Sequence, residues 1–367
     1  MMNSEFDRKM MECCFELAAE GAGRTAPNPL VGAVVVARGE IVGQGSHRAA
    51  GKPHAELVAL HRAGPRAAGG TLYLNLEPCS HTGRTPPCAE AVIEAGVARV
   101  VAAMRDPNPL VKGRGFARLR RAGIEVEVGL LADRARRLNE IFIHNVLTDS
   151  PFVSLKLAQT LDGKIAEGPG LRTQISGRDS LRLAHGLRAR HGAVLVGVPT
   201  VIADDPLLTV RGIRGAQQPV RVVLDPSLRI PSLCKLVASS DRYPTFILFD
   251  PERAGRPQLT ALGGGNLELV ELGSNSEGLF DLHKVGKLLY QRGITSVLVE
   301  GGRRVATACL REHLVQRLHL FISPRLLGED GPLHGIGDIG AGRSGLALRD
   351  VEQRLSGEDF YLTARLD

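Results

Sequence analysis

The feature that most constrains the fold of this chain is a set of three metal-ligand side chains from two separate segments. His54 lies in the first segment, while Cys79 and Cys88 lie in the second, with residues 80–87 between the two cysteines. One histidine nitrogen and two cysteine thiolates form a ligand set that zinc takes in catalytic sites, where a fourth position stays open for water. The two segments must therefore meet in the folded chain, and the sequence predicts one Zn²⁺ ion per chain bound there.

Glu56 stands just beyond His54 and outside this ligand set. A carboxylate in that place can take a proton from the water and pass it to a leaving amine. A His-x-Glu pair followed by Pro-Cys-x-x-Cys is the established pattern of zinc deaminases of nucleobases. In this chain the cysteines are farther apart, and the longer loop carries His81 and Arg84, which can hold an anionic group. The alternative interpretation is that both cysteines are buried thiols that only pack.

The length and composition describe an ordinary globular protein with room for two domains. The chain has 367 residues, of which 43% are hydrophobic and 23% charged, and no stretch approaches a membrane span. Because the first residues lack a basic region followed by an apolar core, we expect no secretory signal and a cytoplasmic location. The six cysteines do not form a disulfide framework in a chain of this length. The net charge of +7 does not by itself decide between a nucleic acid and a small phosphorylated molecule as partner.

The first part of the chain alternates between helical and β-rich patterns. Residues 5–22 have apolar side chains at helical spacing, and two β-rich runs at 31–37 and 41–45 are joined by a hairpin signal. Residues 54–63 are predicted to be helical, so that the first ligand and the carboxylate fall in one helical turn. Further strands are expected at 71–76, 99–104 and 124–128, with helices at 88–95, 115–122 and up to about 147. The pattern predicts a small α/β domain with its metal ligands at a helix start and a strand-to-helix loop.

A polar break at residues 148–151 separates this series from a second one. Strands are expected at 152–158, 193–198, 220–224, 245–249, 267–272, 295–299, 317–322 and 360–365, and helices at 180–190, 279–292 and 305–314. We therefore expect two α/β domains, at residues 1–148 and 149–367. Lys156 is expected at the end of the first strand of the second domain.

Several short motifs, distributed over nearly the whole chain, resemble the bifunctional deaminase/reductase of riboflavin biosynthesis. They lie at residues 25–32, 54–56, 77–88, 161–166, 203–206 and 300–302. The resemblance implies an α/β chain with an N-terminal cytidine deaminase-like three-layer domain followed by a dihydrofolate reductase-like domain. It implies that the first domain deaminates 2,5-diamino-6-(5-phosphoribosylamino)pyrimidin-4(3H)-one. The second domain would then use NADPH to reduce the ribosyl group of the product to ribityl.

The same resemblance implies roles for individual residues. Glu56 and Lys156 would be catalytic, with zinc on His54, Cys79 and Cys88. The residues that would contact the deaminase substrate are Asn28, His47, His81, Arg84, Asp106 and Asn108. The residues that would contact NADPH are Ala158, Gln174, Thr200, Asp204, Gly302, Arg303, Arg304, Val305, Ala306, Thr307 and Ala308. The residues that would contact the reductase substrate are Arg172, Arg188, Leu208, Arg211 and Glu300.

Two departures from the family pattern fall in the second domain. The family usually has Ser-x-Trp-Ile-Thr where this chain has residues 172–176, so Arg172 replaces a serine near the substrate and Gln174 replaces a tryptophan near the cofactor. Pro226 stands where a serine is common. One alternative is therefore a deaminase whose reductase domain is degenerate.

Two further alternatives remain open from the sequence alone. A deaminase of nucleic-acid bases shares the zinc pattern, but such an enzyme stacks bases on aromatic side chains, and aromatic residues make up only 4% of this chain. A non-enzymatic binding module would close the fourth zinc position with a protein ligand, for which His81 is the candidate. We expect a small phosphorylated pyrimidine as substrate, no nucleic-acid or membrane partner, and a homo-oligomer.

Overall fold

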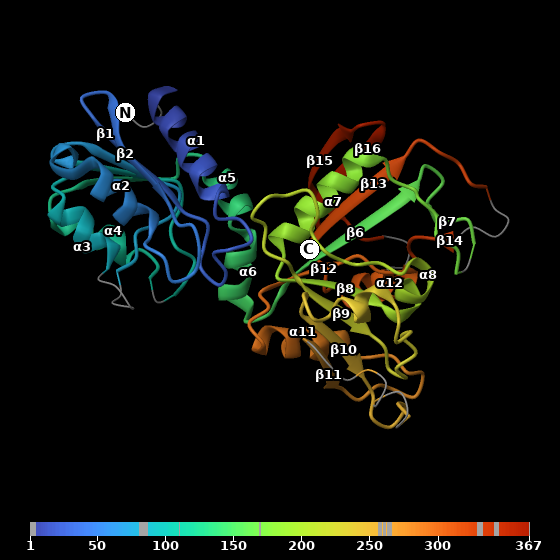
Figure 1. Cartoon of the computed structure of the whole chain (residues 1–367). Coiled ribbons are helices and arrows are strands. Elements are labelled where there is room, and N and C mark those ends of the chain that lie inside the picture. Colours follow the sequence, from blue (N-terminus) through green and yellow to red (C-terminus); the bar gives the residue numbers. More distant parts are fainter. Residues whose placement is uncertain are drawn as a thin grey trace. The chain divides into compact units, whose positions relative to one another are not determined.

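The computed structural model describes residues 5–80, 87–109, 111–168, 170–255, 259, 262, 266–328, 333–340 and 345–366. The chain divides into two compact units, Met1–Asp149 and Ser150–Asp367 (Figure 1). No helix in the described part of the chain has both the length and the apolar character that a membrane crossing requires.

The first unit contains a five-stranded sheet in the order β2-β1-β3-β4-β5. The strands are β1 Gly32–Ala37, β2 Glu40–Ser46, β3 Thr71–Leu74, β4 Arg99–Ala102 and β5 Glu125–Val128. The pairs β1–β2 and β1–β3 are antiparallel, while β3–β4 and β4–β5 are parallel. The helices are α1 Glu5–Ala19, α2 Ala55–Ala63, the short 3-10 helix η1 Gly64–Ala67, α3 Cys88–Glu94, α4 Arg114–Arg121, α5 Ala132–Leu138 and α6 Glu140–Thr148. The expected hairpin is confirmed by the pairing of β1 with β2.

Glycines let helices approach both faces of this sheet closely. A Cβ added to Gly32 in β1 would lie 2.1 Å from the carbonyl oxygen of Cys14, so α1 packs directly against that face. A Cβ added to Gly43 in β2 would lie 2.2 Å from the carbonyl oxygen of Ala59 in α2. Gly43 pairs with Val35, whose side chain points to the face opposite Gly32 because side chains alternate along a strand. The first unit therefore has three layers, with the sheet between α1 and α2.

The prediction of one helix running to about residue 147 is wrong, because Asn139 divides it into α5 and α6. The Asn139 side chain is buried and does not lie against its own helix. Its Oδ1 accepts from the Leu30 amide at 2.7 Å, and its Nδ2 donates to the Leu30 carbonyl at 3.0 Å. Asn75 donates to the same carbonyl at 2.8 Å. These two side-chain amides fix the segment that carries Asn28.

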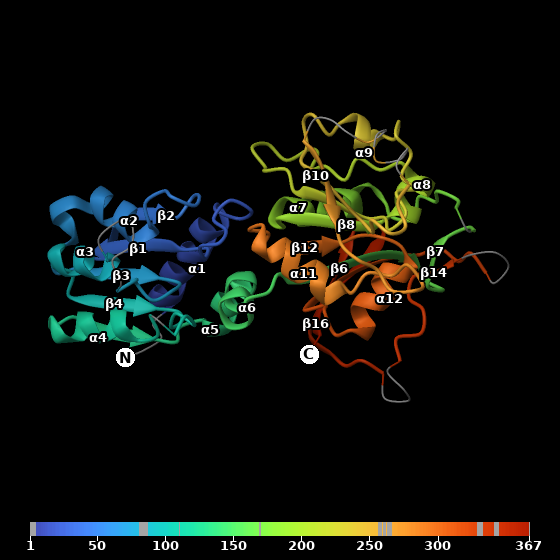
Figure 2. The same ribbon diagram turned by 90° about the horizontal axis from the view of Figure 1, so that it is seen from below.

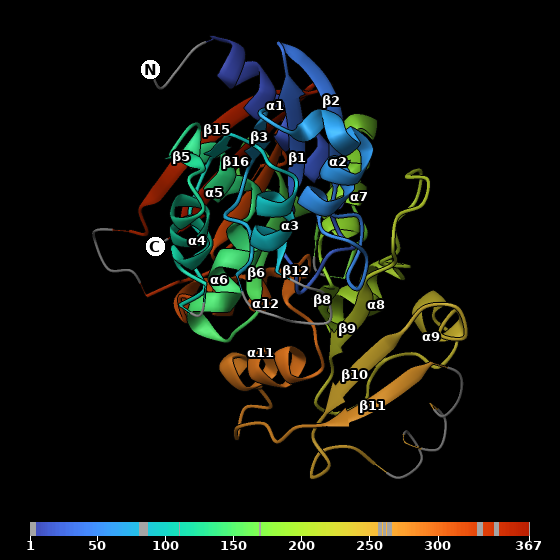
Figure 3. The same cartoon turned by 90° about the vertical axis from the view of Figure 1, so that its left-hand side faces the viewer.

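The second unit contains a nine-stranded sheet in the order β11-β10-β9-β8-β12-β6-β13-β16-β15. The strands are β6 Phe152–Thr160, β8 Ala193–Gly197, β9 Val220–Leu224, β10 Thr245–Phe249, β11 Leu267–Glu271, β12 Ser296–Val299, β13 Arg317–Ser323, β15 Leu348–Ser356 and β16 Asp359–Leu366. The short strands β7 Lys164–Ala166 and β14 Leu333–His334 form a separate pair. The helices are α7 Arg178–Arg190, α8 Val198–Asp204, α9 Lys235–Ala238, α11 Leu282–Gln291 and α12 Arg303–Arg311. In Figure 3, β8, β9, β10 and β11 follow one another across the sheet.

Both faces of the central strands are covered. Leu195 and Val299 belong to a hydrophobic cluster that includes residues of α11 and α12, whereas Val196 and Leu298 belong to a cluster that includes residues of α7, α8 and α9. Figure 2 shows α7 on one side of β8 and β12, with α11 and α12 on the other. Parallel strands buried on both faces read as continuous apolar runs, which is why the sequence predicts them well.

Several features of the second unit differ from the sequence predictions, among them the short elements β7, α9 and β14, which were not predicted. The edge strand β15 was not expected, because its residues are exposed along nearly its whole length and carry no apolar run. Helix α8 follows β8 without a loop and was also missed. Lys156 does not end the first strand, since β6 continues to Thr160.

Candidate active sites

Three elements of the first unit bring the predicted zinc ligands together. His54 is the N-cap residue of α2, Cys79 lies in the loop after β3, and Cys88 begins α3. Their ligand atoms all lie within 4.8 Å of one another. His54 Nδ1 is 3.1 Å from Cys88 Sγ and 3.8 Å from Cys79 Sγ. This donor set fits a tetrahedral zinc ion that keeps one position for water.

Glu56 lies beside this cluster but outside it. Its side chain is only 4% exposed, and a hydrogen bond with Cys88 and charge interactions with His54 and Cys79 place it next to the ligands. Burial raises the pKa of Glu56 to about 6. The hydrogen bond with Cys88 lowers the pKa of the Cys79 thiol to about 4, as a metal-binding thiolate requires. A carboxyl group with a pKa near neutrality is suited to carry a proton in both directions.

Two of the predicted substrate contacts, His47 and Asn28, are hydrogen-bonded to each other, and His47 lies next to His54. The His47 ring lies 5.3 Å from the His54 ring in an edge-to-face arrangement. Its Nδ1 is 3.1 Å from the Pro53 carbonyl, which can only accept, so this nitrogen carries the proton. Its Nε2 then accepts from Asn28 Nδ2 at 3.1 Å. Burial lowers the pKa of His47, which favours this neutral form.

The other predicted contacts of the deaminase substrate lie in different segments. Asp106 is buried in the loop after β4, and its Oδ1 accepts from the Asn108 amide at 2.8 Å. The Asp106 amide in turn donates to Glu77, two residues before Cys79, at 3.2 Å. His81 and Arg84 lie outside the described residues.

In the second unit, a polar cluster surrounds Lys156. Arg188 in α7 forms a buried bidentate ion pair with Glu300, with distances of 2.5 Å from Nε to Oε1 and 2.8 Å from Nη2 to Oε2. The register of β12 with β6 pairs Val299 with Leu155, so Glu300 follows at the level of Lys156. Burial lowers the pKa of Lys156, while the nearby charge of Glu300 acts in the opposite direction. The sequence did not foresee that two predicted substrate contacts pair with each other.

The segment with the other predicted reductase-substrate contacts is held against α7. Arg188 Nη1 donates to the Thr209 carbonyl at 3.0 Å, and the ring of His185 contacts the same carbonyl at 3.1 Å. Leu208, just before it, is buried and has a positive φ of 53°, whereas Arg211 is exposed. Arg172 lies near enough to Asp204 for its charge to lower the pKa of that carboxyl, although burial raises it more strongly. The predicted substrate contacts thus gather around α7 and the end of α8.

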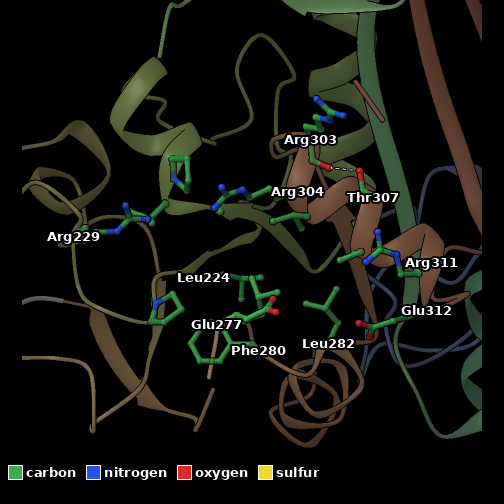
Figure 4. Close-up of a pocket in the computed structure, with 18 residues that line it drawn as sticks. Leu224, Arg229, Glu277, Phe280, Leu282, Arg303, Arg304, Thr307, Arg311 and Glu312 are labelled. Atoms are coloured by element: carbon green, nitrogen blue, oxygen red, sulfur yellow. Dashed lines mark hydrogen bonds between the residues drawn. The ribbon is translucent and has the colours of Figure 1, made fainter. Parts of the chain in front are cut away.

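A cavity of about 580 Å³ lies at the start of α12 in the second unit, lined by none of the cluster residues named above (Figure 4). The predicted cofactor contacts that line the cavity are Arg303, Arg304, Val305, Thr307 and Ala308 in α12. Residues that the sequence reasoning missed also line it, among them Gly197, Val198, Pro199, Leu224, Arg229, Phe280, Leu282 and Arg311. Arginines next to a helix start, above the apolar side chains of Leu224 and Phe280, fit the phosphates and flat rings of NADPH.

Several predicted cofactor contacts do not line this cavity. Ala158 and Asp204 lie toward the Lys156 cluster, and Ala306 is buried in the core. The Gln174 side chain donates to the Ser176 carbonyl at 2.7 Å. Thr200 and Gly302 do not line the cavity either, although they lie close to each other, since a Cβ on Gly302 would lie 3.0 Å from Thr200 Oγ1.

The missed cavity residues follow from topology. Gly197 and Leu224 are the last residues of β8 and β9. Ligands of open α/β sheets bind at these ends. The carboxyl ends of the predicted strands were therefore the available signal, whereas the approach of Phe280 from the loop before α11 had none.

Comparisons with known proteins match both halves of the chain. The model of the cytidine and deoxycytidylate deaminase zinc-binding region matches residues 4–104, and that of the RibD C-terminal domain matches residues 151–362. A riboflavin biosynthesis protein RibD from Aquifex aeolicus is 45% identical over 96% of this chain and 94% of its own length. The Escherichia coli RibD is 39% identical over 88% of this chain and 89% of its own length.

Solved structures of whole chains agree. A RibD structure from Acinetobacter baumannii has a TM-score of 0.85 and 36% identity, and covers 99% of both chains. A diaminohydroxyphosphoribosylaminopyrimidine deaminase/5-amino-6-(5-phosphoribosylamino)uracil reductase from Thermotoga maritima has a TM-score of 0.83 and 34% identity, with the same coverage. The expected deaminase-like and reductase domains are thereby confirmed. This chain belongs to the RibD family of bifunctional riboflavin-biosynthesis enzymes, which combine a zinc-dependent deaminase with an NADPH-dependent reductase.

Proposed function

We propose that the first unit deaminates 2,5-diamino-6-(5-phosphoribosylamino)pyrimidin-4(3H)-one at the site of His54, Cys79 and Cys88. The observation that carries this proposal is the convergence of three zinc-type ligand atoms within 4.8 Å, beside the buried carboxyl group of Glu56. Zinc bound by these residues supplies a water whose pKa is lowered to about 7.

Glu56 performs the proton transfers of this reaction. Its carboxylate accepts a proton on the metal side and delivers it to the amine that leaves the pyrimidine ring. Neutral His47 and Asn28 lie beside the proposed ligands, and their hydrogen bonds fix the orientation of both side chains. The substrate is thus oriented before the proton moves.

The second unit reduces the deaminated product, and Lys156 is the side chain that acts on the reacting sugar. The residues that line the cavity at the start of α12 would hold NADPH, which would supply the hydride. The Lys156 ammonium supports the sugar oxygen as the hydride arrives. The Arg188–Glu300 pair holds the carboxylate of Glu300 at the level of Lys156, where burial lowers the pKa of the lysine and the negative charge of Glu300 acts against this lowering.

The two reactions belong to separate parts of the chain in this proposal. Residues 1–148 form the deaminase domain and residues 149–367 the reductase domain. The partner is a small phosphorylated pyrimidine in the cytoplasm and not a nucleic acid or a membrane.

We also propose that the protein is a homo-oligomer that uses β15. This strand ends the nine-stranded sheet, and Val351, Leu355 and the neighbouring Phe360 are 52%, 66% and 50% exposed. Exposed sheet edges with apolar side chains commonly pair with another chain. Light scattering of the purified protein would give a multiple of 39.3 kDa, and a monomer at working concentration would contradict this part.

A product analysis tests the two activities. The purified protein is incubated with the diaminopyrimidinone nucleotide, first without and then with NADPH. The products are separated and identified by their molecular masses. We expect the deaminated ribosylamino compound alone without NADPH, and the ribitylamino compound with it. Unchanged nucleotide in both reactions would contradict the first assignment, and a ribosylamino product in both would contradict the second.

A further inference from the structure

The Glu77 carboxylate lies behind the deaminase site and receives four backbone N–H groups. Its Oε1 accepts from Gly115 at 2.9 Å and from Phe116 at 3.3 Å. Its Oε2 accepts from Gly113 at 2.9 Å and from Asp106 at 3.2 Å. The side chain is 3% exposed, so water does not compete for these bonds.

Among the described residues, the charge of Glu77 is balanced by backbone amides and not by a cationic side chain. Within the described residues, no lysine, arginine or histidine forms an ion pair with Glu77, and the four amides take that role. Two of the amides belong to the first turn of α4, where the N–H groups have no partner within the helix and the dipole favours a negative charge. A carboxylate that accepts several amide bonds makes strong, charge-assisted contacts.

These bonds connect the loop after β3 with the segment between β4 and the first turn of α4. Glu77 directly precedes Pro78 and Cys79, in the loop that carries metal ligands, and its own amide donates to the Met104 carbonyl at 3.1 Å. Two of the four amides, those of Asp106 and Gly113, come from the loop between β4 and α4, which also carries Asn108.

The backbone is also shaped for this contact. A Cβ on Gly115 would lie 2.2 Å from the Pro78 carbonyl oxygen and 3.2 Å from Glu77 Oε1. Gly113 has a φ of +85°, a conformation that glycine adopts without strain. Both glycines let the start of α4 reach the Glu77 carboxylate.

We propose that Glu77 is a positioning residue for the deamination, which fixes the loop of Asp106 and Asn108 at the substrate while leaving the zinc ligands unaffected. This inference rests on the proposed function and on the expectation, implied by the family resemblance, that Asp106 and Asn108 contact the pyrimidine nucleotide. Glu77 touches neither the substrate nor the metal in this proposal. It acts by holding the backbone from which the contacts project.

The test compares steady-state kinetics of Glu77→Gln with wild type in the full-length protein. Glutamine keeps the shape but presents an NH₂ group to amides that need an acceptor. We expect KM for the diaminopyrimidinone nucleotide to rise roughly 10- to 100-fold, the order of effect that a small misplacement of contacts produces. We expect kcat to fall less, and zinc to remain at one per chain. Zinc at one per chain shows that the first unit is folded, and unchanged NADPH oxidation with the deaminated intermediate shows that the second unit is folded.

A second variant keeps the test decisive if Glu77→Gln does not fold. Gly115→Ala pushes α4 away from Pro78 without changing a polar group, and should give the same rise in KM. Glu94→Gln is the matched control, because Glu94 is exposed at the end of α3 and should change neither constant.

The outcomes separate this inference from the function on which it rests. A wild-type KM in both Glu77→Gln and Gly115→Ala would overturn it. Loss of zinc, or a changed absorption spectrum of the cobalt-substituted variant, would also overturn it, because the effect would then lie on the loop of Cys79. Absence of deamination by the wild type would instead overturn the proposed function.

Discussion

The deaminase site and the reductase site are assembled from the chain in different ways. In the first unit, the proposed zinc ligands and Glu56 come from residues 54–88 and meet where two helices begin. In the second unit, the central ion pair joins Arg188 and Glu300, which are 112 residues apart. A metal gathers its ligands around one point, whereas a site for both a cofactor and a sugar must be wide. Single substitutions should therefore have a sharper effect in the first site.

The largest effect is expected for Glu56→Gln. The amide keeps the shape of the side chain but cannot accept and return a proton, so deamination should fall by about 10²-fold or more. Zinc should remain at one per chain because Glu56 lies outside the ligand cluster. Metal analysis and product formation measure both quantities. Near-normal deamination would contradict the proton-transfer role, and loss of zinc would make Glu56 a ligand.

Lys156→Ala should slow reduction by roughly 10²-fold, the cost of one lost electrostatic donor. The variant should also leave Glu300 with one less positive neighbour, but Arg188 still pairs with that carboxylate. NADPH oxidation with the deaminated intermediate measures the second step alone, and deamination is the internal control. An unchanged rate would reject the role of Lys156. A wild-type protein that oxidises no NADPH would show that Arg172, Gln174 and Pro226 mark a degenerate reductase.

The two units should also differ in their response to acid. Burial lowers the pKa of His191 to about 4 and that of His319 to about 3, where Ser154 and Tyr361 contact their rings. In the unfolded chain these rings take up protons below about pH 6.5. The stabilisation of the folded state is thus complete above pH 6.5 and is lost as the pH falls toward 4, by up to about 3 kcal/mol for His191.

Urea unfolding at pH 7.5 and pH 5 would measure this loss. Three of the four tyrosines, Tyr243, Tyr290 and Tyr361, lie in the second unit, so near-ultraviolet tyrosine signals report mainly on it. His191→Gln should reduce the difference between the two pH values. An equal difference in wild type and variant would show that His191 is not responsible.

The smallest effect is expected from cutting the chain at the proposed domain boundary. Residues 1–148 contain a hydrophobic cluster of their own, so this fragment should bind zinc and deaminate at a rate within a few-fold of the whole protein. Zinc content and deamination of the purified fragment test this. An insoluble or inactive fragment would show that the two halves depend on each other.

The sequence predicted those parts of the molecule in which local pattern determines structure. The proximity of His54, Cys79 and Cys88, the hairpin of β1 and β2, and the buried strands β9 and β10 are as expected. What it missed depends on contacts between distant segments. The division at Asn139 comes from side-chain bonds to Leu30, 109 residues away. The hydrogen bonds from four backbone amides to Glu77 also join separate segments of the chain, so local sequence pattern did not predict them.

The cavity beside α12 was only partly predictable for a related reason. Its α12 lining was named from the family motif, but Phe280 enters from another segment. The exposed strand β15 has no apolar pattern because neither its edge nor most of its side chains are covered within the chain. Sequence periodicity reports burial, so it cannot reveal an exposed strand.

The most direct test of two independent sites on one chain is a complementation measurement. Glu56→Gln and Lys156→Ala are each incubated with the diaminopyrimidinone nucleotide and NADPH, alone and then mixed, and the ribitylamino product is quantified. Alone, Glu56→Gln should leave the nucleotide unchanged, and Lys156→Ala should accumulate the deaminated ribosylamino compound. The mixture should form the ribitylamino product, because each variant supplies the step that the other lacks. A mixture that forms no more of this product than the variants alone would contradict the account.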